Sequence, residues 1–483
     1  MAYERKEISI ENIRAQEAIC ARIREMLTAR VGQPLAMVDT YGCQQNEADS
    51  EKLRGHLAEM GCGFTQDEFS ADIIVVNTCA VREHAEMRVL GNVGQLNHSK
   101  KAKPGQIIAV CGCMVQQEHM AEKIKKSYPV VDLVFGPHDL WHFPELLLRV
   151  MTGKKRVFAT ERCDGYVTEG MPLKRDGKVK AWLSVMYGCN NFCTYCIVPY
   201  TRGRERSRPK ADILREVERA AENGYKEVML LGQNVNAYGK DMDYRDGDFA
   251  SLLAEASEIP GLFVVRFMTS HPKDVSDRLI EVIGEKEKVE PHFHLPLQSG
   301  SDRVLREMNR RYTSAEYLKI VEKLRKVRPE IALTTDIIVG FPGETEDDFQ
   351  KTLELVEKAR FDAAFTFIYS AREGTPAAER DDQIEREIIN DRYRRLTDLQ
   401  YALSLESNER QIGKTVDVLI TGRSETNAEV MSGRTADNRL VHIPLPELSQ
   451  SPDNAEEYYT NRVVSAEIVA AGSFALEGRL ITL

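Results

Sequence analysis

The stretch GCNNFCTYC, residues 188–196, places three cysteines within a short segment that follows the apolar run AWLSVMY. The cysteines are Cys189, Cys193 and Cys196. Glycine and asparagine around them disfavour a helix, so we expect a loop that wraps a metal ion or a cluster. Structural zinc sites and cubane iron–sulfur clusters normally take four protein ligands. Three thiolates would leave one metal position open, as a reactive site requires.

The chain around this loop alternates between short apolar segments and amphipathic helical stretches. Six such segments follow residue 180, from AWLSVMY to DAAFTFIYS at 362–370. This alternation predicts βα units around a parallel sheet. Six units are too few for a complete eight-stranded barrel. The sequence therefore predicts a partial (β/α)6 barrel over 181–410, including a long charged exit helix.

A second group of cysteines follows predicted strands nearer the N-terminus, in an α/β domain expected at 35–152. LAMVDTYG, ADIIVVNTC and QIIAVCGC are each apolar runs that lead to a cysteine, and the three candidates are Cys43, Cys79 and Cys113. Because carboxyl ends of parallel strands meet at one edge of a sheet, these thiols are predicted to share a site. The alternative is three unrelated buried cysteines. Cys111 lies inside its strand, so Cys113 is the better candidate.

Composition and the remaining segments complete the organisation. The chain has 483 residues and a formal net charge of -10, which gives no global attraction to nucleic acid. No export signal or membrane-length apolar run is present, so we expect a cytoplasmic protein without a membrane partner. The ten cysteines then favour metal binding over disulfides. We expect a helical extension at 1–34, a linker at 153–180 and a small antiparallel β-barrel at 411–483. No role is predicted for Cys20, Cys62 or Cys163.

The Cys-x3-Cys-x2-Cys spacing joined to a partial barrel resembles the radical S-adenosylmethionine (SAM) superfamily. The resemblance implies a 4Fe-4S cluster on the three cysteines of 188–196, with SAM on the open iron, and Tyr195 covering the cluster. Placement at strand ends predicts further SAM contacts at Gly232, Gln233, Gln298 and Asp336. A zinc site is the alternative.

The complete organisation from 35 to 483 resembles the methylthiotransferases. That resemblance implies a second, auxiliary 4Fe-4S cluster on Cys43, Cys79 and Cys113, which carries the sulfur to be transferred. LLGQNVNAYG (230–239) and HLPLQSGSDRVLREMNRRYT (294–313) are similar to the members that act on N6-dimethylallyladenosine beside the tRNA anticodon. The implied partners are this tRNA stem-loop, a sulfur donor, and an electron donor such as flavodoxin or ferredoxin; a monomer is expected.

RNA contacts are predicted in two places. In TRGRERSRPK (201–210) the arginines alternate, so an extended backbone would place them on one side, where they could follow phosphates; an arm with internal Arg–Glu pairs is the alternative. These arginines are Arg202, Arg204, Arg206 and Arg208. The C-terminal barrel resembles a TRAM domain, an OB-like RNA-binding module, but is net-acidic, so a local face with Arg423, Arg434 and Arg439 would contact RNA.

Two other functional hypotheses stay open from the sequence. The first keeps the chemistry but changes the substrate to threonylcarbamoyladenosine in tRNA or to a ribosomal-protein aspartate. The second is of a different class, a non-enzymatic RNA-binding protein stabilised by zinc.

Overall fold

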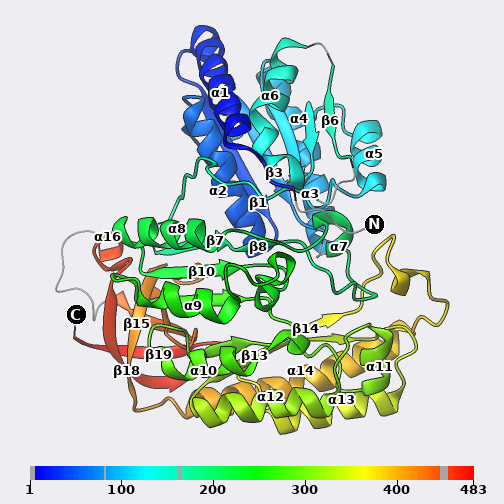
Figure 1. Cartoon of the computed structure of the whole chain (residues 1–483), viewed down its shortest axis with the longest axis vertical. Coiled ribbons are helices and arrows are strands. Elements are labelled where there is room, and N and C mark those ends of the chain that lie inside the picture. Colours follow the sequence, from blue (N-terminus) through cyan, green and yellow to red (C-terminus); the bar gives the residue numbers. More distant parts are fainter. Residues whose placement is uncertain are drawn as a thin grey trace.

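The chain folds into three units: in Figure 1 the N-terminal unit (blue and cyan) lies above the second (green and yellow), and the C-terminal unit (red) lies beside the second, at the left. The computed structural model describes residues 6–80, 83–153, 155–161, 165–177, 179–445 and 455–482. Its units are a parallel-sheet α/β domain, a partial barrel of six βα strands and a small closed β-barrel. This architecture confirms the predicted fold class.

The first unit is built on a six-stranded parallel sheet with the order β2-β1-β3-β4-β5-β6. Its central strands β3 and β4 are buried along their whole length, as expected for continuous apolar runs covered on both faces. The strands are β1 (Leu35–Tyr41), β2 (Gly63–Phe64), β3 (Ile73–Thr78), β4 (Ile107–Gly112), β5 (Leu133–Phe135) and β6 (Val157–Ala159). The helices are α2 (Gln44–Glu59), α3 (Glu83–Gln95), α4 (Asn97–Ala102), α5 (Glu118–Ser127) and α6 (Phe143–Thr152).

Helix α1 (Ile10–Val31) belongs to this first unit rather than extending away from it. Ser9 caps the helix by accepting a hydrogen bond from the backbone N–H of Asn12. Its buried side chains recur at helical spacing, and Cys20, Ile23 and Leu27 lie in the same apolar core as strand residues of the sheet. The expected helical extension is therefore one wall of the α/β domain.

The second unit contains the six predicted strands as two parallel three-stranded sheets, β11-β10-β7 and β12-β13-β14. The strands are β7 (Lys180–Ser184), β10 (Glu227–Leu231), β11 (Val264–Met268), β12 (His292–His294), β13 (Ala332–Val339) and β14 (Ala363–Ile368). The helices are α7 (Val198–Arg202), α8 (Lys210–Glu222), α9 (Phe249–Glu258), α10 (Asp277–Glu285), α11 (Asp302–Glu307), α12 (Ser314–Val327), α13 (Glu346–Ala359) and α14 (Arg386–Glu409). Strands β8 (Met186–Tyr187) and β9 (Arg206–Ser207) form a separate two-stranded antiparallel sheet.

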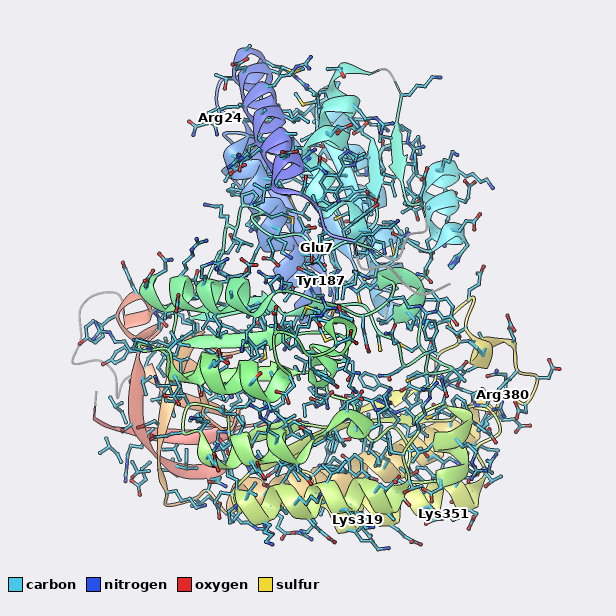
Figure 2. All side chains as sticks on the ribbon, viewed as in Figure 1. Glu7, Arg24, Tyr187, Lys319, Lys351 and Arg380 are labelled. Carbon is cyan, nitrogen blue, oxygen red and sulfur yellow. The ribbon has the colours of Figure 1, made fainter. Side chains whose placement is uncertain are left out.

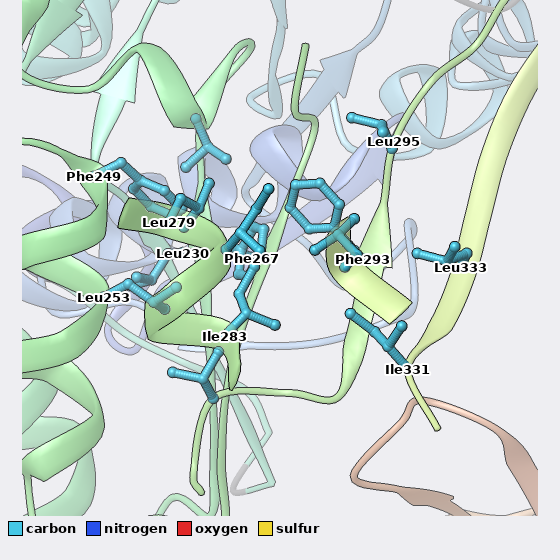
Figure 3. Close-up of a cluster of buried hydrophobic side chains, with 14 of the residues drawn as sticks. Leu230, Phe249, Leu253, Phe267, Leu279, Ile283, Phe293, Leu295, Ile331 and Leu333 are labelled. Carbon is cyan, nitrogen blue, oxygen red and sulfur yellow. The ribbon is translucent and has the colours of Figure 1, made fainter. Parts of the chain in front are cut away.

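The main core of this unit lies between the strands and their covering helices. Leu230, Phe267 and Phe293 project from successive strands toward this layer, and Phe249 of α9 packs against Phe267 (Figure 3). Alternate residues of each strand consequently face the inside of the partial barrel. On β14 those inward residues include Phe365 and Phe367, which stay 49% and 40% exposed.

The third unit is a closed five-stranded barrel of order β15-β16-β17-β19-β18. All pairs are antiparallel except β17 with β19, which is parallel. The strands are β15 (Thr415–Arg423), β16 (Val430–Thr435), β17 (Leu440–Pro444), β18 (Val463–Ala471) and β19 (Leu476–Thr482). A short helix, α16 (Ala455–Tyr459), precedes β18.

A buried arginine joins the second and third units. Arg266 of β11 donates hydrogen bonds of 2.7 Å to the backbone carbonyls of Thr435, the last residue of β16, and of Ala436 directly after it. The same guanidinium forms ion pairs with Glu227 at 3.1 Å and with Glu290 at 3.2 Å, all inside the protein. The end of the partial barrel is thus closed by charge pairing instead of apolar packing.

In the described part of the chain, no helix is both long and apolar enough to cross a membrane.

Candidate two-cluster active site

The first cysteine set converges at one edge of the α/β sheet, as its position after three strands predicts. Cys43 follows β1 and starts α2, Cys79 follows β3, and Cys113 follows β4. Cys43 and Cys79 are hydrogen-bonded, and the backbone N–H of Cys113 donates to Thr78 O at 2.9 Å. Gly112 has φ 99°, and a Cβ there would lie 2.3 Å from Thr78 O, so glycine is needed to bring Cys113 beside the neighbouring strand.

A buried arginine lies beside this first set. The Nε of Arg202 is 3.0 Å from the Sγ of Cys113, and its Nη2 donates to Asp49 at 2.8 Å. Together with the Cys79 hydrogen bond, this guanidinium lowers the pKa of Cys43 to about 6, whereas burial raises the pKa of Cys113 to about 11. The set is therefore an electropositive group of thiols, suited to bind metal as thiolates.

The second cysteine set lies in an irregular loop between β8 and α7, not on a helix. Gly188 has φ 74°, and a Cβ there would lie 2.0 Å from Arg204 O. The backbone at this position can therefore lie against Arg204 only because the residue is glycine. The backbone N–H of Cys189 donates to Gly203 O at 3.1 Å and that of Cys196 to Cys193 O at 2.9 Å. These bonds close the loop, and its three thiols lie close enough together for Cys193 to add to the burial that raises the pKa of Cys189 and of Cys196.

The surroundings of this loop fix its shape. Thr194 is held by hydrogen bonds to Glu307 O and Met308 O, and Asn309 donates 3.0 Å hydrogen bonds to the carbonyls of Asn191 and Phe192. Arg310 lies 3.6 Å from the Sγ of Cys193. Burial raises the pKa of Cys196 to about 12 and also raises that of Cys189. Thiols with such a raised pKa stay protonated near neutral pH, and a metal that binds the sulfur displaces the proton.

The two cysteine sets are neighbours across the junction of the first two units. Ile197, directly after Cys196, packs in one apolar cluster with Cys113 and Ala80. Gln45, two residues after Cys43, donates to Ser184 of β7 at 2.6 Å. Figure 2 places Tyr187 at this junction, and its hydroxyl accepts a 2.8 Å hydrogen bond from Lys52. Two sets of three thiols thus border one region.

The residues predicted to contact SAM lie on both sides of the second cysteine loop. Gln233 accepts a 2.5 Å hydrogen bond from the backbone N–H of Gly188, and Gly232 precedes it at the end of β10. Gln298 adopts φ 69° and donates its backbone N–H to Asp336 O at 2.7 Å. Tyr195 packs against the apolar cluster of Val304, Met308, Phe341 and Ala377. Their contact with SAM stays a prediction.

The prediction of an arginine row along 201–210 needs correction. Arg202, Arg206 and Arg208 are buried, while only Arg204 is exposed. Arg206 donates to the carbonyls of Arg202 and Arg204, and Arg208 pairs with Glu169 at 2.7 Å. Arg202 ends helix α7, so the segment is not one extended strand, and three of the four arginines turn inward because the segment runs between two units. The alternative of a solvated arm with internal Arg–Glu pairs does not describe Arg208 either, since its partners Glu169 and Glu216 lie outside the segment.

The three arginines of the C-terminal barrel that were predicted to contact RNA differ in their exposure. Arg439 keeps 10% of its side chain exposed, and its ion pair with Asp362 at 2.6 Å connects the third unit to the second; it also pairs with Asp437 at 2.8 Å. Arg434 is half-buried and donates to Asn438 O. Arg423 is exposed and pairs with Glu456 at 2.9 Å. Of the three, Arg423 is the one that lies fully on the surface.

Several residues of the site are not predicted from the sequence. Asp49, Gln45 and Arg310 contact the cysteine sets or the loop between them. A charged residue at a buried helix position, as Asp49 is on α2, was the one available signal. Of the unassigned cysteines, Cys20, Cys62 and Cys111 are buried, and Cys163 lies outside the described residues.

Family models match two of the three units. The radical SAM superfamily matches residues 183–356, and an uncharacterised protein family named UPF0004 matches residues 36–136. Among solved structures, the radical SAM methyltransferase TsrM from Kitasatospora setae, with cobalamin and a 4Fe-4S cluster bound, is similar with a TM-score of 0.52. It is 13% identical and covers 72% of this chain and 77% of its own. That likeness supports the fold.

Curated relatives match along nearly the whole length. A tRNA-2-methylthio-N(6)-dimethylallyladenosine synthase from Acetivibrio thermocellus is 48% identical over 479 residues, which are 98% of this chain and 97% of the relative. The protein of the same name from Alkaliphilus oremlandii is 48% identical over 474 residues, 98% of each chain. By this identity and coverage, the chain belongs to the family of tRNA-2-methylthio-N(6)-dimethylallyladenosine synthases.

Proposed function

We propose that this chain is a methylthiotransferase that converts N6-dimethylallyladenosine in tRNA, 3′ of the anticodon, to its 2-methylthio form. The observation that carries the proposal is the meeting of two three-cysteine sets at one junction, in a chain of this family. The family makes the chain an enzyme, a transferase with radical SAM chemistry, and this disfavours a non-enzymatic zinc protein.

The residues present fit the family's cofactors, which are SAM and 4Fe-4S clusters. Cys189, Cys193 and Cys196 would hold the SAM cluster, and Cys43, Cys79 and Cys113 the auxiliary one. When bound, these groups supply the one-electron chemistry that breaks an unreactive C–H bond, and the sulfur that replaces the hydrogen. The chain supplies two incomplete thiol sets, the positive charge of Arg202 and Arg310 beside them, and Gln233, which fixes the start of the second loop.

Partners follow from the same proposal. A tRNA anticodon stem-loop would approach the exposed Arg204 and a TRAM-like third unit with Arg423. The reaction also needs a sulfur donor and an electron donor of the flavodoxin or ferredoxin type. We expect a monomer acting in the cytoplasm, where tRNA is modified.

The inner face of the last barrel strand supports a substrate with an apolar group. Phe365 is paired with Asp336 on the neighbouring strand, and its ring lies 5.9 Å from that of His294. Phe365 and Phe367 remain exposed on this inward face. An aromatic surface beside polar groups matches an adenine that carries a dimethylallyl chain.

Replacing Phe365 by serine should lower kcat/KM for a dimethylallylated anticodon stem-loop roughly 30- to 150-fold, because about 2–3 kcal/mol of apolar contact is lost. Steady-state methylthiolation of the synthetic RNA measures the effect. Phe69→Ser changes an aromatic residue that is equally exposed but lies in the first unit, and it should leave kcat/KM unchanged. Equal behaviour of the two variants would contradict this assignment of the inner face.

Nucleoside analysis of tRNA from cells that lack the protein tests the proposed function itself. We expect 2-methylthio-N6-dimethylallyladenosine to disappear and N6-dimethylallyladenosine to accumulate, with restoration by the intact gene. If methylthiolated threonylcarbamoyladenosine or the modified ribosomal-protein aspartate disappeared instead, the sibling activity would replace the proposal.

A further inference from the structure

Helices α1 and α2 bring metal-binding side chains together at a place remote from both cysteine sets. The Sγ of Cys20, a ring nitrogen of His56 and a carboxylate oxygen of Glu59 all lie within 4.8 Å of one another. His56 and Glu59 are three residues apart on α2, so they share one face of that helix. His56 is about 20 Å along α2 from its first turn, where Cys43 lies. In Figure 2 the nearby Arg24 is correspondingly far from Tyr187.

The imidazole in this group has an unexplained environment. His56 is 2% exposed, and neither Nδ1 nor Nε2 has a hydrogen-bond partner among the described residues. Its ring packs near Phe143, with centroids 6.4 Å apart. A buried ring nitrogen without a partner costs about 1–3 kcal/mol, so a native site is expected to supply a ligand for it.

We propose that Cys20, His56 and Glu59 bind a zinc ion that cross-links α1 to α2. A thiolate, an imidazole and a carboxylate form a donor set that Zn²⁺ accepts in tetrahedral geometry. The ligand atoms of such a site are about 3.3–3.8 Å apart, so the group must contract by about 1 Å. Glu59, which is only half-buried, can supply that movement by side-chain rotation.

The charged groups around the site are compatible with a divalent cation. Glu17, one helical turn before Cys20, and Glu59 are negative, while Arg24 is a cation close to the Cys20 thiol. Arg24 is already engaged, since its Nε donates to Glu59 O at 2.8 Å. A water molecule would take the fourth position. Burial raises the pKa of Cys20 to about 12, so zinc binding would release the thiol proton.

The test uses the full-length protein with its iron–sulfur clusters reconstituted anaerobically, so that the cluster cysteines cannot take up zinc. After equilibration with buffered, low-nanomolar Zn²⁺, we expect close to one zinc per chain by elemental analysis. Zinc X-ray absorption should give one sulfur at about 2.3 Å and nitrogen or oxygen neighbours at about 2.0 Å. Zinc should also raise the melting temperature of this protein.

Matched variants make the result specific. Cys20→Ala and His56→Phe should lose the zinc and its thermal effect while keeping iron unchanged; phenylalanine suits the apolar surroundings of His56. Cys62→Ala removes another buried cysteine of the same core and should keep the zinc. Glu59→Gln, at a half-buried position that puts little strain on folding, should weaken zinc binding roughly tenfold or more in a chelator competition.

Two results would overturn the zinc site. One is a negligible zinc content in the cluster-loaded wild-type protein, and the other is zinc retained in both Cys20→Ala and His56→Phe. Because the readout is zinc and not methylthiolation, either result would leave the proposed enzymatic function untouched.

Discussion

Replacing Cys113 by alanine should lower the iron content of the reconstituted protein from about eight to about four per chain and abolish methylthiolation. Cys113 is one of the three thiols that the described residues bring together at the sheet edge, and two thiolates hold a four-iron cluster poorly. Its removal also takes the sulfur partner from the buried guanidinium of Arg202. The second cysteine set should keep its iron and still cleave SAM, because its loop lies in another unit.

Cys111→Ala is the matched control for this experiment. Cys111 is two residues earlier on β4, is fully buried, and belongs to the apolar core instead of the converging edge. We expect the control to keep about eight irons and its activity. Iron and acid-labile sulfide analysis, together with SAM-cleavage and methylthiolation assays, separates the outcomes. A Cys113→Ala protein with full iron content would remove Cys113 from the auxiliary set.

Replacing Arg266 by methionine should lower the free energy of unfolding of the partial barrel by about 3–5 kcal/mol. The guanidinium is completely buried between Glu227 and Glu290, and it also satisfies two carbonyls of the third unit. Methionine matches its length but leaves two buried carboxylates with less positive charge. The expected loss comes from these uncompensated groups, since Lys180 alone remains to pair with Glu227.

Urea unfolding followed by the fluorescence of Trp182, on strand β7 next to the Glu227 strand β10, measures this effect locally when Trp141 is replaced by phenylalanine in all variants. Arg278→Met is the control. Arg278 is exposed, and its one ion pair among the described residues is a long one, with 3.7 Å between its guanidinium and the Asp248 carboxylate. Such a surface pair contributes about 0–1 kcal/mol. Equal destabilisation by both variants would contradict the role of the buried network.

The same network gives the Arg266→Met comparison a pH dependence. Burial alone would raise the pKa of Glu227. The positive charges of Arg266 and Lys180 lower it by more, so the pKa lies below its ordinary value of 4.5. A carboxylate with a lowered folded-state pKa contributes stability above its unfolded-state pKa and loses it as the pH falls. The difference between wild type and Arg266→Met should therefore be full near neutral pH and shrink below about pH 4.5.

The sequence predicted those parts of the molecule that depend on local pattern. Apolar runs that lead to Cys43, Cys79 and Cys113 imply parallel strands with a common edge, and the structure brings these residues together there. Six apolar segments after residue 180 likewise became the six strands of the second unit. Each of these conclusions needs only short-range periodicity and the geometry of parallel sheets.

What the sequence could not predict depends on packing between distant segments. Alternation in 201–210 indicates that the arginines share a side, but whether that side meets water or another domain is decided by the first unit. The same holds for helix α1, whose apolar face could have rested on any surface. Asp49 shows the difficulty directly, because its partner Arg202 is more than 150 positions later.

The contact between Asp49 and Arg202 constrains how the protein can be recombined with its relatives. It ties helix α2 of the first unit to the last residue of α7, the helix that follows the cysteine loop of the second unit. The two residues therefore have to be inherited together. A chimera that takes its first 152 residues from another species therefore has to bring a compatible acidic residue, or leave a lone buried charge at the seam.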